Sequence, residues 1–376
     1  MMKKVVLMWI LLICGHVSMS AQGDTTTLQK PLDLQKPIDL PIEQEIKEEE
    51  PKKLSWLRRT IRGFTYIDTN YVEPQLYDFT VMAQMTHTYD VYQLRSNEQS
   101  ITFAPAPTIK VGPYFGWKWF FLGYTFDLKH LGLGSQSQKR EIDFSIYTAQ
   151  IGVDLFYRRT GSDYKIRNVK LGSRAVNKEL EGLDFGGLNV GVTGFNLYYV
   201  FNHQRFSYPA AFAQSTRQKI SCGSWLAGVG YTVNSLEFDH EKLQQLVDEH
   251  SQNEKVVVDS SLIFNSIRYH DSCASVGYAY NWVFAPNFLF CASSMFGLAY
   301  KRSVGEGESK KTGFDFSNVN FDYIGRFGVV YNDSRWYAGA SAIIHAYTYR
   351  KPRFAANNVF GSLNVYVGYN FGRKKK

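Results

Sequence analysis

Beyond its N-terminal leader the sequence has no run of about 18 apolar residues, so it predicts no transmembrane helix. Cysteine is also scarce. Only Cys222, Cys273 and Cys291 follow the leader, and none belongs to a C-x-x-C pair. An odd number of cysteines cannot close into a disulfide framework, and this spacing argues against a zinc or redox site. We expect these cysteines to serve as small apolar residues within strands.

Motifs for nucleotide or hydrolytic chemistry are missing as well. The stretch "GEGESKK" (305–311) has the glycines and lysines of a phosphate loop without its spacing, and no G-x-S-x-G elbow occurs. The stretch "DHEKLQQLVDEH" (239–250) carries two histidines too far apart for H-E-x-x-H, and a short amphipathic helix in an outer loop is favoured over a metal site. We therefore predict no catalytic, cofactor-binding or metal-ligating residues, no cofactor and no nucleic-acid partner.

The N-terminal segment predicts export. "MMKKVVLMWILLICGHVSMSAQ" has a basic start, an apolar core and small residues near its end, which is typical of a signal peptide, predicted here over residues 1–21. Cys14 follows Ile13 and not a small residue, so lipidation is disfavoured. Residues 22–55 hold the repeat "LQKPLD–LQKPID" and the run "EQEIKEEEPKK", whose prolines and charges predict an extended or disordered periplasmic spacer. The acidic run leaves a partner-docking role open.

From residue 56 onward the pattern is that of strands. Aromatic residues make up 16% of the chain, yet its mean hydropathy is only −0.27, a combination that suits a transmembrane barrel in which lipid-facing and lumen-facing residues alternate. In "FTVMAQMTHTYDVYQL" (79–94) we expect Val81, Ala83 and Met85 to face lipid and Gln84, Thr86 and Thr88 the lumen. The closing stretch "LNVYVGYNFGRKKK" alternates in the same way, and its aromatic end resembles, in part, the signal read by the barrel assembly machinery.

The strand-like segments predict an all-β fold, a closed antiparallel transmembrane β-barrel of about 12 strands, with ten to fourteen allowed. The expected strands lie near residues 63–72, 79–94, 99–115, 118–130, 140–158, 187–204, 219–238, 260–282, 286–302, 314–331, 335–350 and 357–371. If the last strand ends in the periplasm, "YNDSRW", "NWVFAPNF", "LRSNEQS" and "HQRFSYPAAFAQSTRQ" become periplasmic turns. The segments "YFGWKWF", "RKPRFAANN", "KRSVGEGESKKTG", 159–186 and 239–259 become outer connections.

Two stretches are candidates for a site. "DLFYRRTGSDYKIR" (154–167) groups charged and aromatic side chains that would form either a mouth for an anionic ligand, such as a sugar acid or a lipopolysaccharide phosphate, or the polar girdle of a barrel, which is favoured. Its candidate ligand or girdle residues are Arg158, Arg159, Asp163, Tyr164 and Arg167. In "NHQRFSYPAAF", His203 and Ser207 suggest a base and a nucleophile oriented by Asn202, but strand spacing places the two about 13 Å apart.

Several long stretches resemble one protein family. "DTNYVEP", "GPYFGWKWFFLGYTFDLKH", "IGVDLFYRRTGSDYKIR" and "GFNLYYVFNHQRFSYPAAFAQSTRQ" are similar to a Bacteroidetes family known as domain of unknown function 4421, over roughly residues 62–372. The resemblance implies a secreted protein of Gram-negative bacteria and an outer-membrane barrel. It implies no activity and no functional residues.

These observations predict a monomeric, non-catalytic outer-membrane protein (residues 56–376) with a structural, porin-like or ligand-binding role. Its expected partners are outer-membrane lipid, lipopolysaccharide and the barrel assembly machinery. Its spacer and C-terminal tail are expected in the periplasm. Two alternatives remain open, an outer-membrane enzyme acting on lipid or glycan and a soluble periplasmic β-protein.

Overall fold

The fold is known from a computed structural model. It describes residues 66–105, 108–117, 120–123, 126–127, 140–160, 163–251, 254–303, 318–351 and 353–373. All of them belong to one compact unit, Leu54–Lys376. The expected signal peptide, the spacer and "GEGESKK" lie outside the described residues. No helix among the described residues is both long enough and apolar enough to cross a membrane.

Strands dominate the described chain. They join into one antiparallel sheet of 16 strands and a second sheet of two. The strands are β1 (Val72–Pro74), β2 (Tyr77–Arg95), β3 (Ser100–Pro105), β4 (Thr108–Trp117), β5 (Phe120–Gly123), β6 (Phe126–Asp127), β7 (Arg140–Tyr147), β8 (Ile151–Arg159), β9 (Tyr164–Lys170), β10 (Asp184–Phe185), β11 (Leu188–Val200), β12 (Thr216–Gln218), β13 (Cys222–Phe238), β14 (Ser266–Ala285), β15 (Phe288–Ser303), β16 (Val319–Asn332), β17 (Trp336–Lys351) and β18 (Phe354–Arg373). The helices are α3 (Arg174–Leu180), α4 (Tyr208–Phe212), α5 (His240–His250) and the 3-10 turn η2 (Ser260–Leu262).

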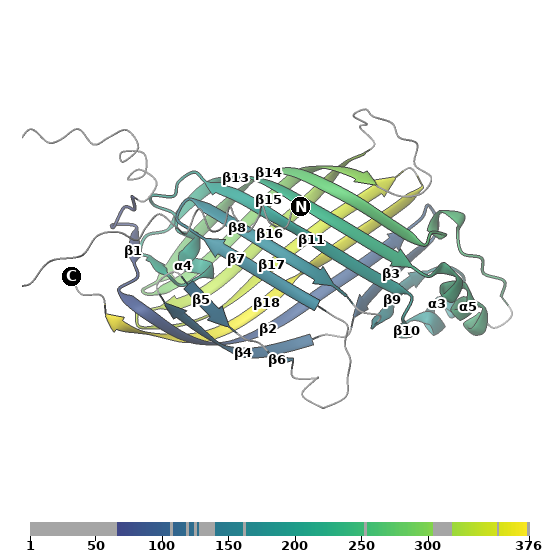
Figure 1. Ribbon diagram of the computed structural model, residues 1–376, viewed down its shortest axis with the longest axis horizontal. Coiled ribbons are helices and arrows are strands. Elements are labelled where there is room, and N and C mark those ends of the chain that lie inside the picture. Colours follow the sequence, from purple (N-terminus) through teal and green to yellow (C-terminus); the bar gives the residue numbers. More distant parts are fainter. Residues whose placement is uncertain are drawn as a thin grey trace, which may run out of the picture. The chain divides into compact units, whose positions relative to one another are not determined.

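Neighbours in sequence are mostly neighbours in the large sheet. From β13 to β18 each strand pairs with the next, and β11 lies between β8 and β13. β18 then pairs with β2 along nearly its whole length, from Ala355 opposite Arg95 to Arg373 opposite Tyr77, and the two strands lie side by side in Figure 1. We call the end of the sheet with Tyr77 and Arg373 the tail end, and the end with Arg95 and Ala355 the apical end.

The alternation along each strand separates two faces. On β2, Val81 and Met85 are exposed on the outer face, while Thr80 and Thr88 are buried on the inner face. On β18, Val365 continues the outer face beside Met85. The two sets of side chains therefore lie on opposite faces of the strand, as the alternation predicts. β2 is long enough to serve two partners, because β4 pairs with its first half and β3 with its last residues.

Two expected strands are wrong, and their errors compensate. Of the segment 63–72, the described residues contribute to the sheets only Val72, the first residue of β1. β1 pairs with β12 in the small sheet and not with the large one. The segment 140–158 is not one strand but the hairpin β7–β8. Thr148 closes its turn, since its hydroxyl donates to the carbonyl of Ile151 (2.7 Å) and accepts from the amide of Ile151 (2.9 Å).

The described part of the segment 63–72 does not supply a strand of the large sheet, and the segment 140–158 supplies two strands instead of one. The strands between these segments therefore run in the direction opposite to the expected one. "LRSNEQS" (94–100) was expected on the side of the C-terminal tail but lies at the apical end, and "YFGWKWF" (114–120) lies at the tail end, where Trp117 faces Phe79. The turns "YNDSRW" and "NWVFAPNF" lie at the tail end, as expected, and "RKPRFAANN" at the apical end. Of "KRSVGEGESKKTG", residues 304–313 lie outside the described residues.

The apical end carries a packed apolar core, which we call the apical cluster. It gathers β3, β9, β10, α3, α5 and the segment 256–262, and Figure 1 shows α3 and α5 at this end of the long strands. Among its fully buried members are Phe103, Phe185, Leu180, Leu243 and Val247. The segments 159–186 and 239–259, expected as outer connections, are therefore folded parts of a core. The amphipathic helix expected at 239–250 is confirmed as α5.

At the tail end the connection between β11 and β13 folds back onto the inner face of the sheet. Its helix α4 begins at Ser207, whose side chain accepts a hydrogen bond from the Ala210 amide. Tyr208 is buried there, and its hydroxyl forms a hydrogen bond with Ser293 of β15 (2.5 Å). Gln214 donates to the hydroxyl of Tyr366 on β18 (2.6 Å). The long tail-end connection predicted from the sequence thus fills space between strands.

Candidate functional site

Three charged side chains meet inside the sheet, and we call them the ionic triad. Lys301 of β15 lies between Asp271 of β14 and Asp322 of β16, with its Nζ 2.8 Å from one carboxylate oxygen of each. All three are buried. The strand register places Lys301 directly opposite Asp271. The rings of Tyr269 and Tyr347 flank the ammonium at 6.0 and 5.2 Å.

A second buried charge lies nearer the tail end. Arg326 of β16 forms an ion pair with Asp154 of β8, and its guanidinium stacks on the ring of Tyr198, 4.8 Å from the centroid. Asp154 also accepts a hydrogen bond from the hydroxyl of Ser145 (2.7 Å). β8 and β16 are far apart in the strand order, so this pair spans the inner face of the sheet.

Among the described residues, the space beside the ionic triad is too small for a ligand. The cavity beside the ionic triad measures about 10 Å³, which is the space of at most one water molecule. Its lining includes Asn196, Thr232 and Met295. Buried charges that form ion pairs with one another, with no space for a ligand beside them, act as packing elements. The triad and the Arg326–Asp154 pair therefore link strands across the inner face of the described sheet.

Positive charge gathers instead at the apical end. Arg95, Arg350, Lys351 and Arg353 line a hollow of about 300 Å³, which we call the basic groove. The β2–β3 turn and the β17–β18 turn form it, since Ser96, Asn97, Phe354 and Ala355 complete its lining. No carboxylate lines it, and among the described residues none forms an ion pair with Arg95, Arg350 or Arg353.

Asp259, the N-cap residue of the η2 turn, is an acidic group that senses this charge. Hydrogen bonds from the backbone and the hydroxyl of Ser261 lower the pKa of its carboxyl, and the charge of Arg353 adds to the effect. The amide of Asp259 donates to the side chain of Gln99 in the β2–β3 turn (2.7 Å). The lowered pKa keeps Asp259 ionised, and its Oδ1 accepts both hydrogen bonds from Ser261.

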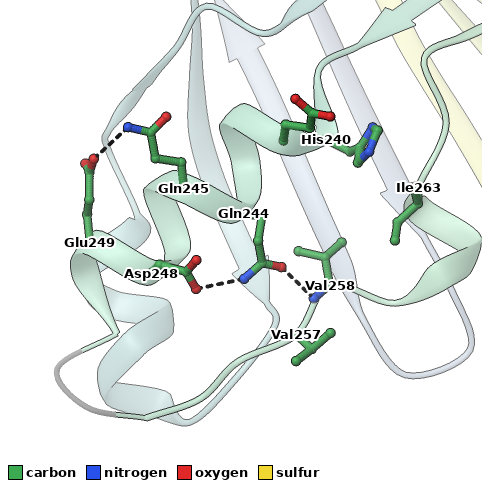
Figure 2. Close-up of a pocket in the computed structure, with 9 residues that line it drawn as sticks. His240, Gln244, Gln245, Asp248, Glu249, Val257, Val258 and Ile263 are labelled. Atoms are coloured by element: carbon green, nitrogen blue, oxygen red, sulfur yellow. Dashed lines mark hydrogen bonds between the residues drawn. The ribbon is translucent and has the colours of Figure 1, made fainter.

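A second apical hollow lies against α5 and measures about 670 Å³. Figure 2 shows how Gln244 joins α5 to the segment 256–258, since it accepts from the Val258 amide (3.1 Å) and donates to Asp248 (2.8 Å). Gln245 donates in the same way to Glu249 (3.1 Å). Four of the polar side chains that line this hollow, Gln244, Asp248, Gln245 and Glu249, are therefore bonded in pairs. Among the described residues, no three His, Cys, Asp or Glu side chains are placed to hold a metal ion.

The five candidate residues of the sequence do not form one cluster. Arg158 is buried on the inner face, over the ring of Phe360 (4.9 Å), whereas Arg159 is exposed on the outer face of the same strand. Tyr164 is buried in the apical cluster and its hydroxyl donates to Thr160 (2.9 Å). Asp163 and Arg167 are exposed. These five residues therefore do not share one surface, and the structure offers no geometry for the less favoured interpretation as a single mouth for an anionic ligand.

The base–nucleophile pair that strand spacing disfavours finds no support in the local contacts either. The hydroxyl of Ser207 is used as the N-cap of α4 and in a hydrogen bond with Thr216 (2.7 Å). Asn202 does not orient His203, because its amide donates to Gly223 and Cys222. His203 instead lies edge-on to the ring of Tyr199.

Sequence reasoning missed the basic groove because its parts are distant in the chain. "RKPRF" (350–354) was recognised only as an outer connection, and Arg95 was assigned to the opposite end. The signal that joins them is the pairing of β18 with β2, which sets Ala355 opposite Arg95 and next to Arg350.

Comparison with known proteins gives a family but no activity. No curated protein matches the chain. Solved structures with some likeness include the outer membrane protease OmpT of Escherichia coli (7% identity, 81% of this chain and 100% of that one, TM-score 0.33), the toluene transporter TodX of Pseudomonas putida (9%, 79% and 91%, 0.26) and OmpT of Vibrio cholerae (10%, 79% and 99%, 0.25). At such TM-scores these likenesses support neither a shared fold nor a shared function. Residues 66–371 match the Domain of unknown function (DUF4421), and the chain belongs to that family.

Proposed function

We propose that this protein is a non-catalytic β-barrel of the outer membrane, closed by twelve strands and filled by its own side chains. The single observation that carries the proposal is the polarity of the sheet. Its inner face buries Lys301 and Arg326 completely, while Phe321 (72% exposed), Phe296 (64%) and Val276 (57%) stand on the outer face. Soluble proteins rarely expose contiguous apolar area on this scale, whereas a transmembrane barrel requires it.

The strand order supports closure. β18 already joins the last hairpins to β2, and β4 continues from β2 on the other side. The described pairings leave β7 at one margin and β5 with β6 at the other. Pairing of β7 with a strand formed by β5 and β6 would complete a ring with β2, β4, β8, β11 and β13–β18, which makes twelve strands.

Aromatic side chains support the membrane placement. At the tail end, Phe79 stacks on Phe371 (5.4 Å between centroids) and Trp336 packs on Tyr369 (4.6 Å). Arg335 covers the Tyr369 ring at 5.3 Å. Rings of this kind are typical of the boundary between acyl chains and headgroups. We place the tail end in the periplasm and the apical end on the outer side of the membrane. The alternative function is that of an outer-membrane enzyme that acts on lipid or glycan.

Substitution of Val276 by arginine tests whether the outer face of the sheet meets lipid or water. Val276 lies near the middle of the 20-residue strand β14, on the outer face. In lipid, an arginine at that depth should lower the free energy of unfolding by roughly 2–4 kcal/mol. In water, an arginine at an exposed position should change it by less than about 0.5 kcal/mol. Denaturant titration of protein refolded into liposomes measures the difference.

The matched control is Glu237→Arg, an exposed position of the neighbouring strand β13 at the apical end. It should cost little, because we place it above the acyl chains. Equal and small effects of both substitutions would show that the outer face of the sheet meets water, and would contradict the barrel.

A filled interior predicts that the protein does not conduct. Purified protein in a planar lipid bilayer should show no stepwise ion current, because the ionic triad, the Arg326–Asp154 pair and α4 occupy the inner face. Stable unitary currents from the folded wild type would instead support a porin-like role. A heat-dependent shift in gel migration confirms in parallel that the sample is folded.

A further inference from the structure

The outer face at the apical end is layered in a way that suits the surface of a membrane. Across β17, β18 and β2 the strand register aligns side chains in rows. From the rim inward these rows are Arg350, Ala355 and Arg95, then Thr348, Asn357 and Gln93, then Ala346, Val359 and Val91. Charge is thus followed by amides and a hydroxyl, and only then by apolar side chains.

The spacing of these rows sets their depth. Four residues separate Arg95 from Val91, which is about 13 Å along an extended strand and less along the membrane normal once the strands tilt. Asn357 donates to Gln93 between them (3.1 Å), so the middle row is bonded within itself. The arginines therefore lie at the level of the headgroups when the apolar rows face acyl chains.

The basic groove also has the composition of an anion site. Lys351 is held by Asn318 (2.8 Å), while Arg95, Arg350 and Arg353 are exposed side chains without an acidic partner among the described residues. Guanidinium groups bind the oxygens of a phosphate through paired hydrogen bonds. Cationic side chains gathered without an ion-paired carboxylate repel each other, and an anion between them removes that repulsion.

We infer that the basic groove binds the phosphate group of a phosphorylated glycolipid in the membrane leaflet at the apical end, with Arg95 and Arg350 as its main contacts. This inference rests on the proposed membrane placement. A free phosphate offers the same charge but lacks the acyl chains that would lie along Val359 and Val91. The lipid is therefore the source to which the layered face is suited.

Lipid A, a phosphorylated glucosamine lipid, is the probe that tests the inference. Its binding to the detergent-solubilised protein is followed by native mass spectrometry for wild type, for Arg95→Gln with Arg350→Gln, and for the control Arg167→Gln with Arg174→Gln, which removes the same charge from exposed apical positions outside the groove. The affinity of the groove variant for lipid A should be lower than that of wild type by a factor of roughly ten or more, since hydrogen bonds to charged groups contribute on that order. The control should match wild type.

Two further arms identify the source of the phosphate. Dephosphorylated lipid A should bind wild type as weakly as phosphorylated lipid A binds the groove variant. Inorganic phosphate should not compete at millimolar concentration. Equal binding by the groove variant, equal binding of the dephosphorylated lipid, or displacement by inorganic phosphate would each overturn the inference. Heat-dependent gel migration of every variant reports the barrel independently, so failure of the site and failure of the membrane placement remain distinguishable.

Discussion

Lys301→Met is expected to destabilise the protein by about 3–5 kcal/mol, because it leaves two carboxylates buried without their shared counter-charge. Lys301 is the ion-pair partner of both Asp271 and Asp322. One oxygen of each carboxylate has no hydrogen-bond partner among the described residues, so neither aspartate has an alternative cation. The free energy of unfolding, from denaturant titration in liposomes, is the measurement.

The same substitution at a surface ion pair is the matched control. Lys165 pairs with the exposed Asp184 at 2.7 Å, and Lys165→Met should cost at most about 1 kcal/mol. A second test adds Asp271→Asn and Asp322→Asn to Lys301→Met. Removing all charges together should recover most of the lost stability, since neutral groups of similar shape can replace a buried ionic set. Two results would contradict a stabilising role of the triad. One is a Lys301→Met variant as stable as wild type, and the other is a triple variant whose free energy of unfolding is no higher than that of Lys301→Met.

The long strands were predictable because their signal is local. Alternation of Val81, Ala83 and Met85 with polar residues depends only on the geometry of one strand, and so does the alternation that ends the chain. Helix α5 was equally accessible, because Leu243 and Val247 repeat at helical spacing and are the residues it buries. These elements need no knowledge of their neighbours.

The failures arise where local chemistry is unusual or where partners are distant. The β7–β8 turn contains no glycine, proline or asparagine, and a threonine hydroxyl closes it instead, so the sequence shows no turn signal there. The ionic triad and the basic groove both depend on strand register, which brings together residues separated by 21 to 30 positions or by far more. A single sequence does not specify that register.

The apical cluster was missed for a different reason. Its connections are long, and long connections in a barrel suggest solvated outer loops. Yet α3 buries Val176 and Leu180, and α5 packs beside it with Leu243. Charged residues on the outward sides of these short helices mask the apolar ones in a simple count of polarity. Periodicity is the signal in both loops, because Val176 and Leu180 of α3 repeat at the same helical spacing as Leu243 and Val247 of α5.

Removal of Val367–Lys376 is expected to abolish assembly of the protein. The deleted residues of β18 pair with β17 from Trp336 to Ala338 and with β2 from Tyr77 to Ala83, so one deletion removes two ladders at the tail end. It also removes Asn370, whose side chain donates to Ser334 in the β16–β17 turn (2.9 Å). Two unpaired strand edges within a membrane are too costly to persist.

The truncated chain should therefore be degraded or accumulate as aggregates, with no heat-dependent band in the membrane fraction. The matched control deletes only the three lysines 374–376, which leaves every described pairing of β18 in place. That variant should insert and shift on heating like wild type. If the variant without residues 374–376 also fails to assemble, the effect belongs to the basic tail and not to the pairing of β18. Membrane insertion of the longer deletion would mean that β18 does not close the sheet, because pairing of β18 with β2 could then be lost without losing the fold.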